Sequence, residues 1–210
     1  MENNPVKKRR NGIETTRRIL EIGADLFARK GYDNVSLREI ADAVGIKESS
    51  LYNHFKSKSA LKESLFTSFA EMTFGSRPSD SELEKMLFIM SPEEIFKNIV
   101  FNVGKNINAV AQNVAIIIHN EKYRDTQAFE MYERYLIKEP VEYYKRLIEK
   151  MMARKMIQPV DAYLFAEQYN YVSIALTQEY FMAKNGLADE NVIVKKMLKT
   201  LCFFIDLMKG

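Results

Sequence analysis

Residues 35–61, VSLREIADAVGIKESSLYNHFKSKSAL, constrain the local fold of this 210-residue chain more than any other segment. Ser36 and Glu39 have the S-x-x-E spacing of a capping box, which marks the start of a helix. The apolar residues that follow recur at helical spacing and define one inward face: Leu37, Ile40, Ala41 and Val44. Gly45 can take the left-handed conformation that ends many helices. The pattern therefore predicts a helix over residues 37–44 and a tight turn after it.

A second, short helix is predicted over residues 47–54, about 12 Å long at the usual rise per residue. Only Leu51 and Phe55 can anchor it inward. The remaining side chains are polar or aromatic and are left to face outward: Lys47, Glu48, Ser49, Ser50, Tyr52, Asn53 and His54. A short helix that presents many hydrogen-bonding groups suits insertion into the major groove of DNA.

These residues resemble the DNA-binding domain of the tetracycline-repressor (TetR) family of bacterial transcription regulators. The resemblance covers roughly the first 65 residues and no more. It rests on Ile19-Leu20, Ala24, Leu26-Phe27, Gly31-Tyr32, Val35-Ser36-Leu37, Ile40-Ala41, Val44-Gly45-Ile46, Leu51-Tyr52, His54-Phe55, Ser57-Lys58 and Leu61. The family often has serine or threonine where this chain has Lys47. That departure predicts a weaker cap on the second helix.

The resemblance implies that the chain binds double-stranded operator DNA through the second helix and its surroundings. The expected contact residues are Ser36, Arg38, Lys47, Glu48, Ser49, Ser50, Tyr52, Asn53, His54 and Lys58. Within this set we expect Lys47 and Asn53 to face base edges. We expect Tyr52, His54 and Lys58 mainly to hold phosphates.

Composition and charge agree with a helical, nucleic-acid-binding chain. Hydrophobic residues make up 47% of it, with only eight Gly and five Pro, and strand-like alternation is missing. We therefore predict an all-α fold of about nine helices. Residues 1–60 carry 12 Lys and Arg against 8 Asp and Glu, a balance of +4, whereas residues 61–210 carry 19 against 20, a balance of −1. The excess of positive charge lies in the part expected to meet phosphates, although so mild an excess also fits an ordinary solvated surface.

A cytoplasmic location is expected. Cys202 is the only cysteine, which excludes an intramolecular disulfide, and we expect it to be a small core residue. The basic run at residues 7–10 is not followed by an apolar stretch, so a signal peptide is not predicted. No segment approaches the roughly 20 apolar residues that span a bilayer, and no membrane partner is expected.

The predicted organisation is a flexible basic arm (1–11), a helix-turn-helix domain (12–60) and a helical domain for ligand binding and dimerisation (61–210). The arm is either a solvated tail or a minor-groove contact. Further helices are predicted over residues 13–30, 58–74, 82–90, 91–108, a segment reaching 119, 125–156, 160–184 and 189–208, with a loop at 75–81. Pro140 should break or kink the helix over 125–156.

The last two predicted helices, over about 160–184 and 189–208, carry apolar stripes. Such stripes are equally typical of buried core helices and of a dimer interface. In proteins of the family that this chain resembles, these helices pair with their two-fold mates in a four-helix bundle. The resemblance thus implies a homodimer with the interface residues Phe165, Val172, Leu176, Met197, Leu201 and Ile205.

Catalysis has little support in the sequence. Nucleophile-elbow, zinc-protease and phosphate-loop motifs are absent, as is any Cys/His cluster with metal spacing, so we expect no catalytic residue, metal or cofactor. His119 lies near Glu121 and Asp125, but their i, i+2, i+6 spacing does not place them on one helical face. A core or pocket histidine with a local hydrogen bond is the favoured interpretation.

The second half of the chain is rich in aromatic residues and methionine, which fill cores and also line apolar ligand pockets. The resemblance implies a small-molecule cavity there. The expected lining residues are Phe101, His119, Tyr143, Tyr144, Gln168, Tyr169 and Val172, and the expected effector is hydrophobic or amphipathic.

The leading functional hypothesis is a ligand-responsive transcription regulator, a repressor that binds a pseudo-palindromic operator as a homodimer and is released by its effector. Two alternatives remain open. One is a small-molecule-binding helical protein whose DNA binding is degenerate, and the other is an enzyme that uses His119.

Overall fold

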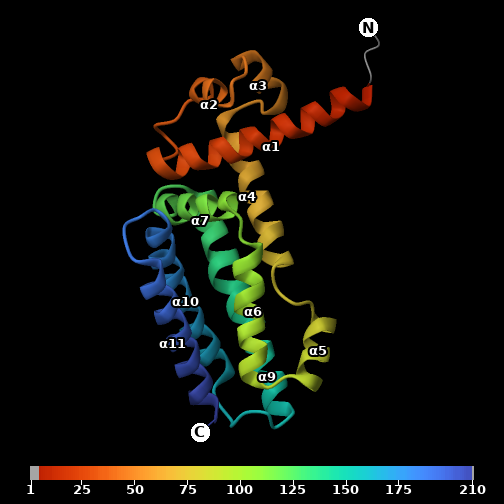
Figure 1. Ribbon diagram of the computed structural model, residues 1–210, viewed down its shortest axis with the longest axis vertical. Coiled ribbons are helices and arrows are strands. Elements are labelled where there is room, and N and C mark those ends of the chain that lie inside the picture. The colour runs from red at the N-terminus through yellow and green to blue at the C-terminus, as the bar shows by residue number, and fades with distance from the viewer. Residues whose placement is uncertain (1–4, 210) are drawn as a thin grey trace. The chain divides into compact units, whose positions relative to one another are not determined.

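The computed structural model describes residues 5–209, and this part of the chain is all-α, as the sequence predicts (Figure 1). It forms two compact units, built from residues 1–72 with 107–131 and from residues 73–106 with 132–210. The predicted boundary after residue 60 therefore falls inside the first unit, which also takes in most of the fourth helix and two later ones.

The first unit is built around the helix-turn-helix segment. Its helices are α1 (Pro5–Lys30), α2 (Leu37–Val44), α3 (Glu48–His54), α4 (Lys58–Gly75), α7 (Ala109–Glu121) and α8 (Thr126–Met131), of which α4 continues into the second unit. Helix α7 packs against α1. The core side chains include Ile19, Phe27, Ile40, Leu51 and Leu61, and all of them are almost fully buried.

The start of α1 differs from the prediction. The helix begins at Pro5, so residues 5–11, expected as part of a flexible arm, are helical, whereas residues 1–4 lie outside the described residues. Proline is favoured in the first turn of a helix, where its missing N–H is not needed. The Lys and Arg residues that follow are good helix formers. The polar side chains of this segment disfavour its burial in a core, but they do not disfavour helix formation.

The two ends of α2 are formed as predicted, with one difference. The Ser36 side chain accepts a hydrogen bond from the backbone N–H of Glu39, and Gly45 takes the left-handed conformation with φ of 78°. The Glu39 carboxylate, however, accepts from Lys30 Nζ at the end of α1. Glu39 therefore also forms an ion pair that ties α2 to α1.

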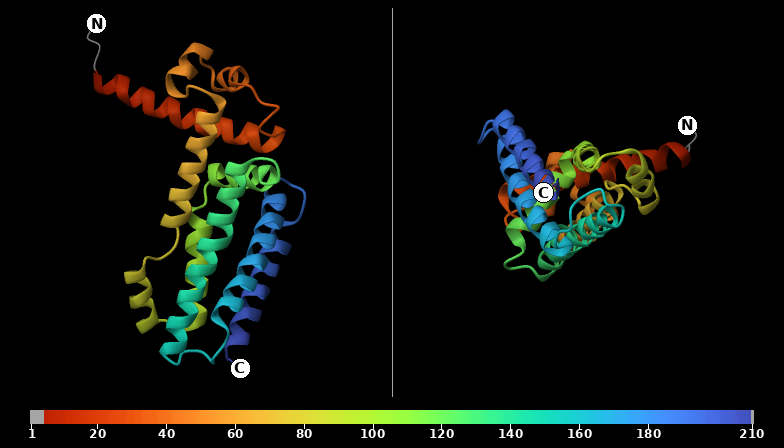
Figure 2. Two further views of the ribbon diagram at one scale, coloured as in Figure 1. Left: turned by 180° about the vertical axis from the view of Figure 1, so that it is seen from behind. Right: turned by 90° about the horizontal axis from the view of Figure 1, so that it is seen from below.

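The second unit contains α5 (Asp80–Ile89), α6 (Pro92–Asn106), a π-helical segment η1 (Tyr132–Lys138), α9 (Glu139–Ala153), α10 (Ala162–Lys184) and α11 (Glu190–Lys209). Helix α10 packs against α9, η1 and α11. Figure 2 shows α10 and α11 running antiparallel and side by side.

The described chain contains eleven α-helices and one π-helical segment, against the nine or so that were predicted. Much of the difference comes from residues 125–156, where one long helix was predicted. The structure divides it into α8, η1 and α9, and Pro140 lies in the first turn of α9. The three elements follow one another without a gap, and the π-helical segment lies just before Pro140, which lacks a backbone donor.

Candidate nucleic-acid interface

Helix α3 is held to the first unit by very few side chains. Leu51 is the one fully buried residue of the helix, and Phe55, which follows it, is also buried. The helix begins after Lys47, whose side chain makes no capping hydrogen bond. The expected loss of the usual cap is confirmed, so tertiary packing and the bonds to the Lys47 carbonyl hold this end of the helix.

The outward face of α3 exposes hydrogen-bonding side chains to solvent. Lys47, Glu48, Ser49, Tyr52 and Asn53 are exposed, and Ser50 is partly exposed. Two further predicted contact residues, Ser36 and Arg38 at the start of α2, are exposed as well. This face offers amide, hydroxyl, carboxylate and ammonium groups together, which is the kind of set that reads base edges and phosphates.

His54 lies at the end of α3 and bonds to α1. Its Nδ1 is 2.8 Å from the hydroxyl of Thr16, and that hydroxyl donates its own proton to the carbonyl of Gly12. The Thr16 hydroxyl thus lies within hydrogen-bonding distance of both the ring nitrogen and the carbonyl. The bond between Thr16 and His54 orients the ring and attaches α3 to α1.

Lys58 has a different position from the one expected. Its ammonium group donates to the carbonyls of Tyr32, Asp33 and Val35 at 2.9, 3.3 and 3.1 Å, and it lies 4.4 Å from the centre of the Tyr32 ring. An ammonium has three donors, and all three are used here. Lys58 therefore holds the turn between α1 and α2, and its predicted phosphate contact has no free donor to make it.

Lys62, one helical turn after Lys58, was not singled out in the sequence. Its Nζ is 2.6 Å from Asp125 Oδ2 and 4.8 Å from the centre of the Tyr32 ring, and the residue is buried. Burial would raise the pKa of Asp125, but the hydrogen bonds from Lys62 and from the Ala128 N–H outweigh it and hold the pKa below its usual value. This buried pair joins α4 to the start of α8.

The comparison with known families identifies this region. Residues 19–65 match the family model described as bacterial regulatory proteins, tetR family. This segment of the chain is similar to the TetR family of bacterial regulatory proteins. The family is one of transcription regulators and not of enzymes.

Curated relatives match only part of this chain. The HTH-type transcriptional repressor KstR2 of Mycolicibacterium smegmatis is 38% identical over 84 residues, which are 37% of this chain and 41% of that protein. The chain thus matches about two fifths of that relative's length.

Solved structures match over nearly the whole chain. A transcriptional regulator of Saccharomonospora viridis, solved in complex with choline, has a TM-score of 0.66 at 21% identity and covers 92% of this chain and 96% of its own. KstR2 of Mycobacterium tuberculosis has a TM-score of 0.63 at 20% identity and covers 88% and 93%. At this identity the likeness establishes the fold of the second unit.

The second unit does not gather the residues expected to line an apolar cavity. Tyr143, Tyr144 and Tyr169 are buried and packed against one another, with ring centres 5.4 and 4.8 Å apart. Phe96 continues the stack, 6.0 Å from Tyr144. Burial raises the pKa of all three tyrosines. The aromatic residues therefore form a packed core, which the sequence pattern could not distinguish from a pocket.

The other expected lining residues lie apart from this cluster. Phe101, Gln168 and Val172 are exposed, and His119 belongs to the first unit. Burial and then the charge of Lys122, whose Nζ is 3.1 Å from Nδ1, lower the pKa of His119. This is the local hydrogen bond expected for the histidine. The residues predicted to line a ligand pocket therefore do not lie together in one site.

Four of the six residues expected at a dimer interface are buried within a single chain: Phe165, Leu176, Leu201 and Ile205. Val172 and Met197 are at least partly exposed. Other exposed apolar side chains of α10 and α11 include Leu164, Tyr171, Val194, Leu198 and Phe203. Cys202 is exposed too, not buried as expected. Most of the expected interface residues thus lie on the inner faces of these two helices.

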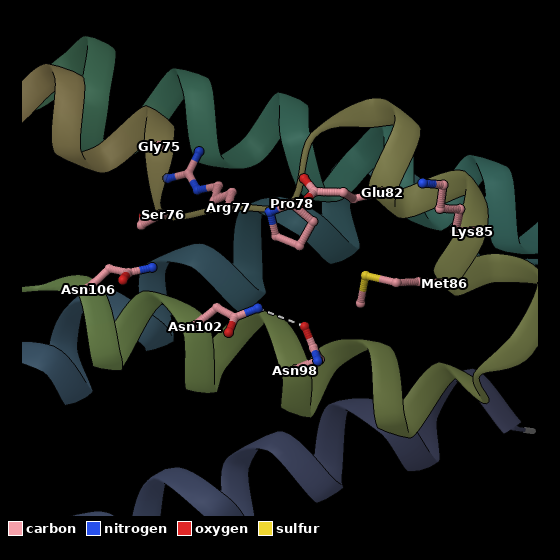
Figure 3. A pocket seen from close by; sticks show the side chains of 10 residues that line it. All are labelled: Gly75, Ser76, Arg77, Pro78, Glu82, Lys85, Met86, Asn98, Asn102 and Asn106. Carbon is pink, nitrogen blue, oxygen red and sulfur yellow. Dashed lines mark hydrogen bonds between the residues drawn. The ribbon is translucent and has the colours of Figure 1, made fainter.

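An open groove of about 470 Å³ lies in the second unit, between the segment after α4, helix α5 and helix α6 (Figure 3). Its lining residues are Gly75, Ser76, Arg77, Pro78, Glu82, Lys85, Met86, Asn98, Asn102 and Asn106. The sequence predicted a loop at 75–81 but no ligand-binding role for any of these residues. The one feature of the sequence that could have predicted this polar lining is the recurrence of asparagine every four residues on α6, at Asn98, Asn102 and Asn106.

Two further findings concern the described residues only. Within residues 5–209 no group of His, Cys, Asp and Glu side chains is placed to hold a metal ion. Nor does this part of the chain contain a helix with the length and apolar character needed to cross a bilayer.

Proposed function

We propose that this chain is a transcriptional repressor that binds a pseudo-palindromic operator as a homodimer and is released by a small molecule. The observation that carries the proposal is the face of α3, where Lys47, Tyr52 and Asn53 are exposed above a helix anchored by Leu51. Helix-turn-helix proteins read the major groove with a helix that is anchored by buried residues on its inner face and polar on its outer face.

In this proposal Lys47 and Asn53 face base edges, and Tyr52 and His54 hold phosphates. Asn53 offers both a donor and an acceptor, which suits a bidentate contact to adenine. Because Nδ1 of His54 bonds to Thr16, Nε2 is the ring nitrogen left to meet a phosphate, to which it would donate as an N–H. Ser36, Arg38, Glu48, Ser49 and Ser50 surround these residues as further contacts, and Lys58 is left out because its donors are occupied.

The homodimer is proposed to form through α10 and α11. Their exposed faces carry large apolar side chains, Leu164 and Tyr171 on α10 and Leu198 and Phe203 on α11, each at least 45% exposed. Apolar patches of this kind mark protein interaction sites. Two-fold pairing would present two copies of α3 to successive major grooves about 34 Å apart.

Release is proposed to follow from ligand binding in the second unit. A ligand that binds one dimer conformation better than the other moves the two α3 helices out of register with the half-sites. The similarity to KstR2, named a repressor, supports repression as the output. The choline bound to the Saccharomonospora viridis protein supports a second unit that accepts small molecules.

A mobility-shift titration tests the proposal. Duplexes from the DNA that flanks the gene are titrated with wild-type protein at several salt concentrations. Binding at nanomolar protein that weakens steeply with salt is expected, because phosphate contacts release counterions. Equal, weak affinity for all duplexes, including unrelated sequence, would contradict an operator-binding role.

A further inference from the structure

The groove between α5 and α6 is lined mainly by groups that donate hydrogen bonds. On one side, Figure 3 shows Asn98, Asn102 and Asn106 along α6. On the other side lie Arg77, just after α4, and Lys85 on α5. Three side-chain amides, a guanidinium and an ammonium thus surround one hollow of about 470 Å³, a volume within the range of small-molecule sites.

Most of this donor capacity is not consumed within the protein. Asn102 Nδ2 donates to Asn98 Oδ1 at 2.8 Å, which leaves the amide N–H groups of Asn98 and the second N–H of Asn102 for the groove. Lys85 is exposed, and Arg77 is only partly buried. The Asn98–Asn102 bond also ties these two amides together along α6.

The single carboxylate of the lining is already engaged. Glu82 Oε2 accepts from the backbone N–H of Ser79 at 2.7 Å and from its hydroxyl at 2.6 Å, in the capping box that starts α5. Its charge is therefore held at the helix end and balances only one of the two cations, Arg77 and Lys85. The groove keeps a net positive charge and an excess of donors.

We propose that this groove is the effector site and that its ligand is a small, oxygen-rich anion, a polyol that carries a carboxylate or a phosphate. This inference rests on the proposed regulatory function and gives the class of its effector. Arg77 and Lys85 bind the anionic group, because charge-assisted hydrogen bonds are the strong ones. The amides of α6 bind the neutral oxygens and orient the molecule.

The same lining argues against the hydrophobic effector that the aromatic residues suggest. Met86 and Pro78 present apolar side chains to the groove beside these polar groups. A lipophilic ligand would bury the amide and cationic groups without giving them partners, which is costly. The aromatic side chains that would have favoured such a ligand are packed against each other in the core.

Thermal-shift and calorimetric titrations with four probes test this inference on the full-length protein. Sorbitol, gluconate and glucose 6-phosphate compare a neutral polyol with its carboxylate and phosphate relatives, and decanoate represents a lipophilic acid. We expect saturable stabilisation by gluconate, by glucose 6-phosphate or by both, and none by sorbitol at the same concentration. The anion that binds better identifies carboxylate or phosphate as the recognised group.

Variants locate the binding. Lys85→Gln should weaken anion binding about tenfold or more, as expected for losing one charge-assisted hydrogen bond. Asn102→Leu, which keeps the side-chain volume, should weaken it as well. Lys105→Gln is the matched control, because it removes an equal charge from an exposed position on α6 that does not line the groove. Arg77→Gln is a weaker test, since Arg77 also lies over the Tyr143 ring.

Three results would overturn the inference. The first is equal stabilisation by sorbitol and the anions, and the second is stabilisation by decanoate alone. The third is an anion affinity that Lys85→Gln and Lys105→Gln change to the same extent. DNA binding is measured separately without ligand, so its absence would count against the regulatory function. If the anion binds in the groove but leaves operator affinity unchanged, the effector role is wrong.

Discussion

The side-chain amide of Asn170 donates a hydrogen bond of 2.9 Å to the backbone carbonyl of Leu136, 34 residues earlier in the chain. In an α-helix that carbonyl would accept from the N–H of residue 140, which is proline and has none. Asn170 is buried in α10 and gives this carbonyl a side-chain donor. The junction of η1 and α9 is thus bonded to a specific side chain of the neighbouring helix.

We expect Asn170→Ala to lower the free energy of unfolding by about 1–3 kcal/mol, the cost of leaving a buried polar group without its partner. Urea denaturation monitored by circular dichroism measures it. Pro140→Ala restores a backbone N–H that can reach the Leu136 carbonyl. In that background the cost of Asn170→Ala should fall by half or more. An equal cost in both backgrounds would show that the two residues are not coupled.

Tyr52→Ala should weaken DNA binding to all sequences alike, whereas Asn53→Ala should reduce discrimination between operator and mutated operator by about 1–3 kcal/mol. The reason is that Tyr52 is proposed to hold a phosphate and Asn53 a base edge. Mobility-shift titrations against an operator series measure both effects. Tyr123→Ala, another exposed tyrosine of the first unit, is the control. If Tyr52→Ala leaves the operator affinity unchanged, the proposal that α3 contacts DNA is wrong.

Lys58→Ala should lower the free energy of unfolding by about 1–3 kcal/mol, because three carbonyls of the α1–α2 turn lose their donor. Lys56→Ala, an exposed lysine two residues earlier, should have little effect on stability. Chemical denaturation measures the difference. The salt dependence of DNA binding should not change in Lys58→Ala. A slope reduced by about one, with stability intact, would instead establish a phosphate contact.

The pair of Lys62 and Asp125 should make stability fall at acid pH. The pKa of Asp125 is lower in the folded chain than its usual value of 3.8, so its contribution is present above that value and is lost as pH falls through the folded pKa. Thermal unfolding between pH 3 and pH 7 should show a steeper acid loss for wild type than for Asp125→Asn. Parallel curves would show that the pair does not stabilise the fold.

Leu198→Glu and Leu201→Glu should give opposite results, although the residues are three apart on α11. Leu198 is 51% exposed, so its replacement should yield a folded monomer, whereas Leu201 is 5% exposed and its replacement should prevent folding. Sedimentation and circular dichroism distinguish the two outcomes. A wild-type monomer at micromolar concentration, or a Leu198→Glu dimer, would contradict pairing through the exposed face.

The sequence by itself determined the features that depend on neighbours within four residues. Backbone geometry and short-range hydrogen bonds decide these local features. They are the caps of α2 at Ser36 and Gly45, the uncapped start of α3 at Lys47 and the change of helix type just before Pro140. The repeated apolar spacing likewise predicted the helices of the TetR-family domain and their inner residues.

Tertiary structure decided everything that depends on which face of a helix is covered. Helices α10 and α11 are apolar on more than one side, so periodicity could not tell that Leu201 faces the core while Leu198 faces outward. The partners of Lys58 and Asn170 lie 23 to 34 residues away and carry no sequence signal, because they are backbone carbonyls. The groove is lined by hydrogen-bond donors from two segments that lie apart in the sequence, α6 and the segment after α4. Only the packing of the second unit brings them together, since side chains distant in the chain become neighbours only when a core has formed.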